Sequence, residues 1–316
     1  MTIAIIFGPT GHVGSAVALS AHSFGATRVI LAMRDPSKPI PGLSPTLEAS
    51  PTRPFQRITA DLSVPSTLTT AVKSTSATHA FIYHIFGSPD HMHSALTALK
   101  SAGITHVVFL STGGLRGDLT LTPPDNPIFW AHAQVELNLL AVFGKENFTP
   151  VRPGFFATNA FLWKAQVPTG KLRIFAPDMT LDWITPGDIG RVTASVLLQG
   201  RKAGDEEAVG IYGPEKISFR DGLGAIVKAV TGREAEIEEV GVEGGVKLYV
   251  EGGTPEMLAR VLVESFAKLK VLQQEGGDWL PVGEEWEEAG KVVERYTGRP
   301  ATKLSEWIEE AKGEFK

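Results

Sequence analysis

Gly8-Pro9-Thr10-Gly11-His12-Val13-Gly14 follows the apolar run Ile3–Phe7 and opens a stretch of helical pattern. A glycine-rich turn between a strand and a helix is the setting in which proteins bind the pyrophosphate of a dinucleotide. Gly8 would allow the tight turn, Gly11 the close approach of the phosphates, and Gly14 the close packing of helix on strand. An ordinary strand-to-helix turn is the alternative. The residues expected to contact the cofactor from this loop and its helix start are Gly8, Thr10, Gly11, His12, Val13 and Gly14.

Short apolar runs alternate with helical stretches through the first half of the chain. The expected strands are residues 3–7, 29–33, 56–59, 80–83, 107–110 and 149–152, and the expected helices are 14–23, 65–72, 92–102 and 127–143. This rhythm predicts an α/β, Rossmann-type doubly wound parallel sheet with helices on both faces. Residues 35–54 contain six prolines and no periodicity, so we expect a surface excursion after the second strand.

The alternation breaks down after residue 152, where we expect a smaller C-terminal α/β substrate lobe. A helix over 186–198, a strand near Ile211, a helix over 219–230 and a strand over 235–240 are predicted there. Residues 243–245 and 251–253, both Glu-Gly-Gly, are interpreted as loop edges. Tryptophans at 279, 286 and 307 predict that the acidic C-terminal region folds back onto the body. The dinucleotide-binding domain is expected at 1–155, with 183–200 returning to it, and the substrate lobe at 156–182 and 201–316.

The composition and charge of the chain argue against nucleic acids and membranes as binding partners. The 316 residues carry a formal net charge of −5 and lack the clustered Lys and Arg that nucleic-acid binding requires. No apolar run reaches the roughly 18 to 20 residues of a membrane-spanning helix, and the first residues do not resemble a secretory signal. The absence of cysteine excludes disulfides and thiolate chemistry. We expect a cytoplasmic monomer or homodimer that acts on a small molecule, without nucleic-acid or membrane partners.

The end of the second strand indicates which dinucleotide is bound. Where NAD enzymes usually place a carboxylate, this chain has Arg34, 20 residues after Gly14. A cation there favours the 2′-phosphate of NADP(H), and Lys38 adds a second cation nearby. Asp61, after the third strand, would reach the adenine amine or cap the next helix. NADP(H) is therefore the predicted cofactor, with NAD, and a merely solvated Arg34, as the alternatives.

Further segments resemble the NmrA-like branch of the atypical short-chain dehydrogenases/reductases over most of the chain. After the glycine motif they are Met33-Arg34-Asp35-Pro36, Ala60-Asp61-Leu62, residues 107–111, His132 with Glu136, Val151-Arg152-Pro153-Gly154 with Asn159, residues 185–191 with Asp188, and Gly213-Pro214-Glu215 with Ser218. The resemblance implies an NADP(H)-binding Rossmann domain with a small substrate lobe, as in secondary-metabolism reductases and redox-sensing regulators. It also implies that Phe86, Gly87, Ser111 and Thr112 lie on the nicotinamide side of the cofactor.

One part of the short-chain dehydrogenase pattern is missing. The usual catalytic Tyr, four residues before a Lys, is replaced here by Ile128 and His132. His132 would bind the nicotinamide ribose or move a proton, with Glu136 one turn later holding the ring, or it would make only a structural hydrogen bond. The candidate catalytic residues are therefore His132, Ser111 and Tyr83.

Aromatic residues near the expected cleft predict an apolar substrate. Phe155, Phe156, Asn159 and Trp163 are the candidate substrate contacts, although such aromatics are more often core residues. His91 and His93 are interpreted as surface histidines at a helix start, because residues two apart on a helix face different directions. No metal site is predicted.

These observations favour an NADP(H)-dependent oxidoreductase that passes hydride directly to a small, largely apolar or aromatic metabolite, in secondary metabolism by resemblance. Two alternatives stay open. A non-enzymatic NADP(H)-binding redox sensor would explain the missing Tyr and Lys, and a cofactor-dependent isomerase would keep the cofactor without net redox change.

Overall fold

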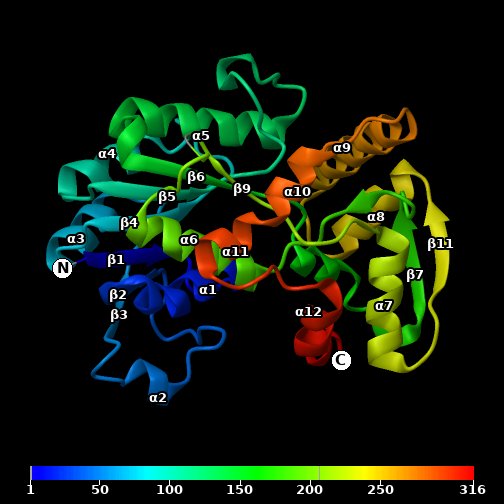
Figure 1. Cartoon of the computed structure of the whole chain (residues 1–316), viewed down its shortest axis with the longest axis horizontal. Coiled ribbons are helices and arrows are strands. Elements are labelled where there is room, and N and C mark those ends of the chain that lie inside the picture. Colours follow the sequence, from blue (N-terminus) through cyan, green and yellow to red (C-terminus); the bar gives the residue numbers. More distant parts are fainter. Residues whose placement is uncertain (1, 206) are drawn as a thin grey trace.

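A large parallel sheet organises the computed structural model, which describes residues 2–205 and 207–316; Met1 and Glu206, which fall in the expected ranges 1–155 and 201–316, lie outside the described residues. The spatial order is β3-β2-β1-β4-β5-β6-β9, and every pair of neighbours is parallel. The strands are β1 (Thr2–Phe7), β2 (Ala26–Met33), β3 (Phe55–Thr59), β4 (His79–Tyr83), β5 (His106–Leu110), β6 (Phe148–Pro153) and β9 (Val209–Ile211). The predicted doubly wound Rossmann-type fold is confirmed (Figure 1).

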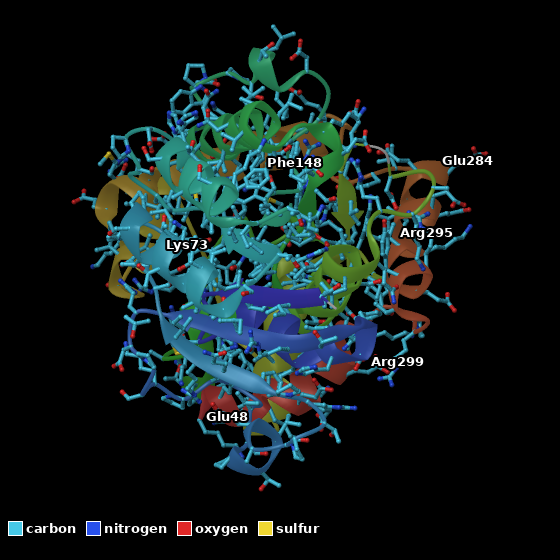
Figure 2. All side chains as sticks on the ribbon, turned by 90° about the vertical axis from the view of Figure 1, so that its left-hand side faces the viewer. Glu48, Lys73, Phe148, Glu284, Arg295 and Arg299 are labelled. Atoms are coloured by element: carbon cyan, nitrogen blue, oxygen red, sulfur yellow. The ribbon has the colours of Figure 1, made fainter. Side chains whose placement is uncertain are left out.

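Side chains along the strands alternate between the two faces of the sheet and belong to two separate hydrophobic cores. Ala4 and Ile6 of β1 pack on one face, and Ile5 and Phe7 pack on the other. Because both faces are buried, the strands are almost continuously apolar. One face is covered by α1 (His12–Ala21), α6 (Pro186–Gln199) and α11 (Val292–Thr297), and the other by α3 (Pro65–Thr75), α4 (His93–Ala102) and α5 (Pro127–Phe143). The end-on view in Figure 2 shows the strands between these helices.

Helices α1 and α6 pack unusually close together. A Cβ built on Gly190 of α6 would lie 2.3 Å from the Cβ of Ala16 on α1. Only glycine at position 190 permits this approach, because real Cβ contacts are not that short. The segment that follows the break in alternation therefore returns to the face of the sheet that carries the glycine loop's helix.

A second lobe lies beside the carboxyl ends of the strands (Figure 1). Its two small sheets pair β7 (Lys171–Phe175) with β11 (Glu236–Val240) and β8 (Thr180–Leu181) with β10 (Ile217–Ser218). Its helices are α7 (Phe219–Thr231), α8 (Val242–Glu251), α9 (Glu256–Gln274) and α12 (Leu304–Ala311). Trp307 of α12 is 5% exposed in the lobe's core, so the C-terminal region folds back as predicted.

Short elements complete the chain. They are α2 (Pro45–Glu48) in the proline-rich excursion, α10 (Glu284–Gly290), and the 3-10 turns His22–Phe24, Leu119–Leu121, Lys145–Asn147, Ala157–Trp163, Val167–Thr169 and Lys312–Phe315. No described helix is long and apolar enough to cross a membrane.

Two expectations about the second half were wrong. Residues 209–211 and 292–297, assigned to the lobe, form β9 and α11 and pack with the large sheet, because β9 pairs with β6 along its free edge. Residues 243–245 are not a loop edge. They form the first turn of α8, where a small residue is needed because a Cβ on Gly245 would lie 3.0 Å from Phe175.

Candidate functional site

The glycine loop joins β1 to α1 at the carboxyl edge of the sheet. Gly8 has a φ of +69°, a left-handed conformation that favours glycine, and its N–H donates to the carbonyl of Ala32 at 3.2 Å. A Cβ on Gly14 would lie 2.1 Å from the carbonyl oxygen of Gly8, so α1 can start this close to the strand only with glycine there. Both residues are therefore required by the protein's own backbone.

Gly11 differs from its two neighbours in the motif. Its φ is −89°, and a Cβ built on it would meet only the carbonyl oxygen of Gly8, at the ordinary contact distance of 3.6 Å. Nothing among the described residues forbids a side chain at position 11. Gly11 is the N-cap of α1, with an exposed backbone at the positive end of the helix, where phosphates bind. This is the arrangement in which helix starts bind the phosphates of dinucleotides.

A pocket of about 310 Å³ opens beside this loop, where β1, β2, β3 and β4 end. The expected cofactor residues that line it are Gly8, Thr10, Arg34, Asp61 and Phe86, together with Tyr83 and His84. Val13 and Gly14 are buried in the first turn of α1 and support the loop. His12 is exposed, and its ring stacks on Phe161 of the second lobe with centroids 5.4 Å apart.

Arg34 and Asp61 form the charged part of this pocket. Burial opposes ionisation of Asp61, but two hydrogen bonds from Ser63 (2.9 and 2.7 Å) and the charge of Arg34 keep its pKa below the usual value. Asp61 does not cap α3, because that helix begins at Pro65 after Val64 and the carboxylate is occupied by Ser63. Arg34 is the one Lys or Arg among the described residues that line the pocket.

Lys38 and Gly87 lie outside the lining of this pocket. Lys38 is on the exposed loop after β2, where its N–H donates to Asp35 and its carbonyl accepts from Arg57. The predicted contact of Lys38 with the 2′-phosphate therefore stays a prediction. Gly87, with a φ of +78°, lines a neighbouring pocket of about 410 Å³ that shares Phe86 with the first.

Tyr83 lines the same pocket as Arg34 and Asp61. Its ring lies against the backbone of Gly8, where an added Cβ would come within 2.6 Å of the Tyr83 Cε1. Burial and the charge of Asp61, opposed by Arg34, raise the pKa of the Tyr83 phenol. Tyr83 thus lies beside the glycine loop, and its role as a proton donor stays a prediction.

His132 presents a hydrogen-bond acceptor and not a donor. Its Nδ1 lies 2.8 Å from the carbonyl oxygen of Ile128, and since a carbonyl can only accept, Nδ1 carries the hydrogen. The neutral ring therefore keeps a lone pair on Nε2. Burial lowers the pKa of His132, against the Ile128 hydrogen bond and the charge of Glu136. The protonated form that would donate from Nε2 is disfavoured near neutral pH.

His84 stacks on His132 at the end of β4. The ring centroids are 4.7 Å apart with planes 29° apart, and Phe86 packs edge-on against His84 at 4.4 Å. Burial, followed by His132 and His91, lowers the pKa of His84 to about 3, and its buried Nδ1 has no partner among the described residues. Sequence reasoning noted His84 only as a titratable group, because the stacking depends on how α5 packs beside β4.

Ser111 is held in a buried polar cluster. Its hydroxyl donates to Glu136 at 2.5 Å, and Arg152 donates to the same carboxylate through Nη2 at 2.6 Å and Nε at 3.1 Å. Glu136 is only 2% exposed. Its carboxylate is thus engaged by Ser111 and Arg152 and does not orient the His132 ring. Ser111 has already donated its one hydrogen, so it can only accept from a ligand, while Thr112 beside it is half-buried.

The expected substrate contacts separate into core and surface residues. Phe155 is 6% exposed and packs edge-on against Trp183 and Phe219, and Trp163 is 2% exposed with its indole donating to Arg173 at 2.8 Å. Both stabilise the lobe's core, and we no longer assign them to the substrate. Phe156 is half-buried and Asn159 is exposed.

Asp182 was missed by sequence reasoning. It is completely buried, and its carboxylate accepts from the N–H of Phe155 at 2.7 Å and of Gly213 at 2.9 Å. Burial raises its pKa to about 7, although both hydrogen bonds and Lys216 act against this. Through these two hydrogen bonds, Asp182 connects the segment after β6 to the segment after β9. No motif in the sequence distinguishes Asp182 from a surface aspartate.

The two histidines at the start of α4 have different surroundings. His91 is half-buried and packs edge-on against Trp130 at 4.9 Å, while His93 is exposed at the first position of α4. Among residues 2–205 and 207–316, no three His, Asp or Glu side chains gather as metal ligands would.

Comparison with known proteins identifies the family. Residues 1–310 match the NmrA-like family. This chain belongs to the NmrA-like family. The NmrA-like protein is 35% identical to the nitrogen metabolite regulation-like protein bik4 of Gibberella fujikuroi, over 96% of this chain and 94% of that one. It is 25% identical to an NAD(P)H azoreductase of Xenophilus azovorans, over 96% of each chain.

A solved structure shares the fold of this NmrA-like protein. The NADPH-dependent quinone oxidoreductase of Escherichia coli, solved with NADPH, superimposes with a TM-score of 0.71 at 20% identity. The alignment covers 98% of this chain and 99% of that one. At this identity the likeness establishes the fold, so the ligand of the pocket has to be argued from the pocket's own residues.

Proposed function

We propose that this NmrA-like protein is an NADP(H)-dependent oxidoreductase that reduces a small, conjugated and largely apolar acceptor by direct hydride transfer. The observation that carries the proposal is the unexplained glycine at position 11. The protein's packing does not require it, yet it stands at the helix start beside a pocket with one arginine. A dinucleotide phosphate passing over Gly11 explains both features.

The residues around the glycine loop offer contacts for the phosphate and adenosine parts of the cofactor. Gly8, Gly11 and the start of α1 would hold the pyrophosphate, and Arg34 would hold the 2′-phosphate with a charge-assisted hydrogen bond. Asp61 would face the adenosine side of the same pocket. When bound, NADPH supplies the hydride, and every further requirement falls on the protein and the substrate.

The side chains near the nicotinamide position restrict the substrate. His132 with a free Nε2 lone pair can accept a hydrogen bond from a ribose hydroxyl, which orients the sugar in place of the missing lysine. Neither His132 nor His84 is protonated near neutral pH, and the hydrogen of Ser111 is committed to Glu136. A simple ketone needs an acid close to its oxygen, whereas a quinone or azo compound delocalises the added charge and takes its proton from water. The name of the azoreductase relative supports this class.

Turnover of NADPH with quinones, azo compounds and simple ketones tests the proposal. We expect oxidation with the conjugated acceptors and none with the ketones. His132→Ala should weaken NADPH binding, while saturating turnover changes by less than the hundredfold or more that loss of a proton donor would cause. His93→Ala, which changes an exposed histidine, is the matched control. Ketone reduction that collapses in His132→Ala would show that His132 is an acid and would overturn the proposal.

A redox sensor is the second candidate, and its support is the 35% identity to a nitrogen metabolite regulation-like protein. A sensor would bind NADPH in the same pocket and consume none of it. Tight binding of NADPH without oxidation by any acceptor in the panel would favour this candidate.

A further inference from the structure

A cavity of about 440 Å³ lies along β9, the strand at one end of the large sheet. The loop after β5 and the end of β6 line one side of it, and α10 and α11, which pack against β9 (Figure 1), line the other. No described residue lines both this cavity and the dinucleotide pocket. Its volume falls within the range of about 300–1,000 Å³ that is typical of small-molecule sites. The proposed oxidoreductase mechanism does not use this cavity.

The tyrosine that follows β9 lines this cavity with an unpaired hydroxyl. Tyr212 is 6% exposed, and its hydroxyl has no hydrogen-bond partner among residues 2–205 and 207–316. The hydroxyl is also not one of the fully enclosed polar atoms that lack a partner, so it keeps open surface toward the cavity. Burial, opposed by the charge of Arg116, raises the pKa of the Tyr212 phenol. The hydroxyl therefore keeps its hydrogen and can donate it to a ligand.

The chain around Tyr212 holds its ring in place. A Cβ on Gly210 would lie 3.1 Å from Cε2 of Tyr212, so the ring lies close over a residue that has no side chain. The ring of Trp286 on α10 packs nearby, with centroids 6.4 Å apart. The next residue, Gly213, donates its N–H to the buried carboxylate of Asp182 at 2.9 Å. The phenol is thus a preorganised donor, and a ligand would lose little free energy in ordering it.

The charged side chains that line the cavity are already paired. Their pairs, with the N···O distances, are Arg116–Glu285 (2.8 Å), Arg152–Glu136 (2.6 Å), Arg295–Asp205 (2.6 Å) and Lys291–Glu288 (2.6 Å). A charged ligand would have to break one of these pairs, because no described lining residue offers an unpaired charge. The apolar side chains of Leu115, Ala289 and Val292 line the cavity as well. These walls favour a neutral ligand.

We propose that this cavity binds a compact, neutral and largely apolar molecule whose carbonyl oxygen accepts a hydrogen bond from Tyr212. The hydroxyl would fix the position of that oxygen, and the apolar body of the molecule would lie against Leu115, Ala289 and Val292. The proposal does not rest on the proposed function, because it involves no residue of the dinucleotide pocket.

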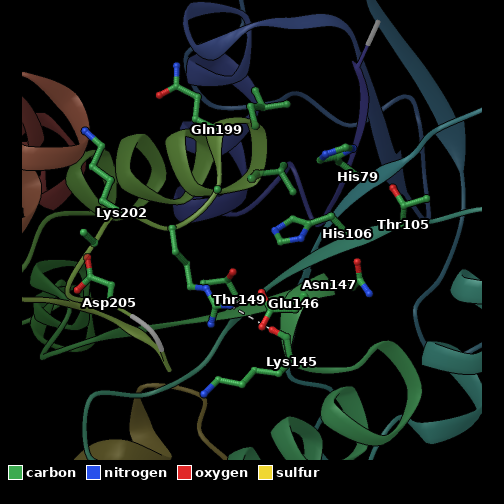
Figure 3. A pocket seen from close by; sticks show the side chains of 15 residues that line it. His79, Thr105, His106, Lys145, Glu146, Asn147, Thr149, Gln199, Lys202 and Asp205 are labelled. Atoms are coloured by element: carbon green, nitrogen blue, oxygen red, sulfur yellow. Dashed lines mark hydrogen bonds and ion pairs between the residues drawn. The ribbon is translucent and has the colours of Figure 1, made fainter.

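A larger cavity, of about 730 Å³, lies where β4 and β5 begin, and His106 and Thr149 line it (Figure 3). The Thr149 hydroxyl and the His106 Nε2 have no hydrogen-bond partner among the described residues, but both atoms are fully enclosed. The guanidinium of Arg201 already contacts Glu146 and the Lys145 carbonyl. We therefore assign no ligand to this cavity, and the accessible hydroxyl of Tyr212 distinguishes the cavity along β9.

Titration with acetophenone, followed by saturation-transfer NMR in the absence of NADPH, tests the proposal. Acetophenone is a neutral ring with one carbonyl, and we expect it to bind at about millimolar concentration. Tyr212→Phe, which keeps the ring and removes the hydroxyl, should weaken this binding about three- to tenfold. Ethylbenzene, which has a similar shape and no oxygen, should bind wild type and Tyr212→Phe equally. Ala289→Phe, which fills the cavity from α10, should abolish binding of acetophenone.

Controls separate the cavity from other sites on the protein. Tyr249→Phe removes a phenol hydroxyl from α8, outside the cavity, and should leave the acetophenone affinity unchanged. NADPH affinity should be the same in all these variants, which also shows that they are folded. Absence of acetophenone binding, equal acetophenone affinities of Tyr212→Phe and Tyr249→Phe, or displacement of acetophenone by NADPH would overturn the proposal.

Discussion

The preference for NADPH over NADH should depend on the Arg34 guanidinium. In Arg34→Ala the described pocket keeps no Lys or Arg, and the charged Asp61 remains to repel the 2′-phosphate. Charge-assisted hydrogen bonds contribute about 1.5–3 kcal/mol each. Because Arg34 is exposed and screened by salt, we take the lower half of that range, which corresponds to a loss of about 10- to 50-fold in NADPH affinity. NADH lacks the 2′-phosphate, so its affinity should stay nearly unchanged.

Isothermal titration of both cofactors into both proteins measures this effect. Lys38→Ala is the matched control, because Lys38 is a nearby exposed cation that does not line the pocket. It should change the NADPH-to-NADH ratio by less than about threefold, as expected for screened surface charges. If Arg34→Ala keeps the wild-type ratio, or Lys38→Ala loses as much of it as Arg34→Ala, the assignment of Arg34 to the 2′-phosphate is wrong.

Three further variants test other parts of the account. Gly11→Val should abolish NADPH binding with little change in thermal stability. Gly14→Val should destabilise the fold, because its Cβ would lie 2.1 Å from the Gly8 carbonyl oxygen. Equal melting temperatures for the two variants would contradict this contrast. Glu136→Gln should lower the free energy of unfolding, measured with denaturant, by about 3–5 kcal/mol, because it leaves Arg152 without its buried charged partner. A decrease below about 1 kcal/mol would contradict a structural role for Glu136. The pKa of His84 is lowered to about 3 in the folded protein, so the free energy of unfolding should fall as the pH drops from about 6.5 toward 3. His84→Gln should therefore make the free energy of unfolding depend less steeply on pH in this range. An unchanged slope in the variant would refute this prediction.

The meeting of three predicted cofactor residues in one pocket could be expected from chain order alone. The carboxyl ends of parallel strands meet at one edge, so Gly8 after β1, Arg34 after β2 and Asp61 after β3 had to converge. Lys38, four residues further along, does not line this pocket. Beyond the end of the strand, the position of a side chain depends on the conformation of the proline-rich loop and no longer on the sheet.

The catalytic half could not be predicted because it depends on contacts between distant segments. Glu136 lies one turn after His132 on α5, which suggested a local pair. The structure instead joins Glu136 to Arg152 on β6 and to Ser111 after β5. Whether Nε2 of His132 donates or accepts depends on the hydrogen bond between Nδ1 and the backbone oxygen of Ile128. The identities of the residues do not show that hydrogen bond. Burial of Phe155 likewise follows from the packing of the second lobe.

The most direct test of the proposed hydride transfer is a single-turnover measurement with NADPH deuterated separately at each of the two C4 positions. A site that holds the cofactor's phosphates near Gly11 and Arg34 and its nicotinamide ribose at His132, as proposed, would present one face of the nicotinamide to the substrate. We predict that one deuterated form slows NADPH oxidation by a quinone or azo acceptor and that its deuterium leaves the cofactor, while the other form reacts at the unlabelled rate. Equal rates for the two forms, or tight NADPH binding with no oxidation by any acceptor, would contradict an enzyme that transfers hydride from this site.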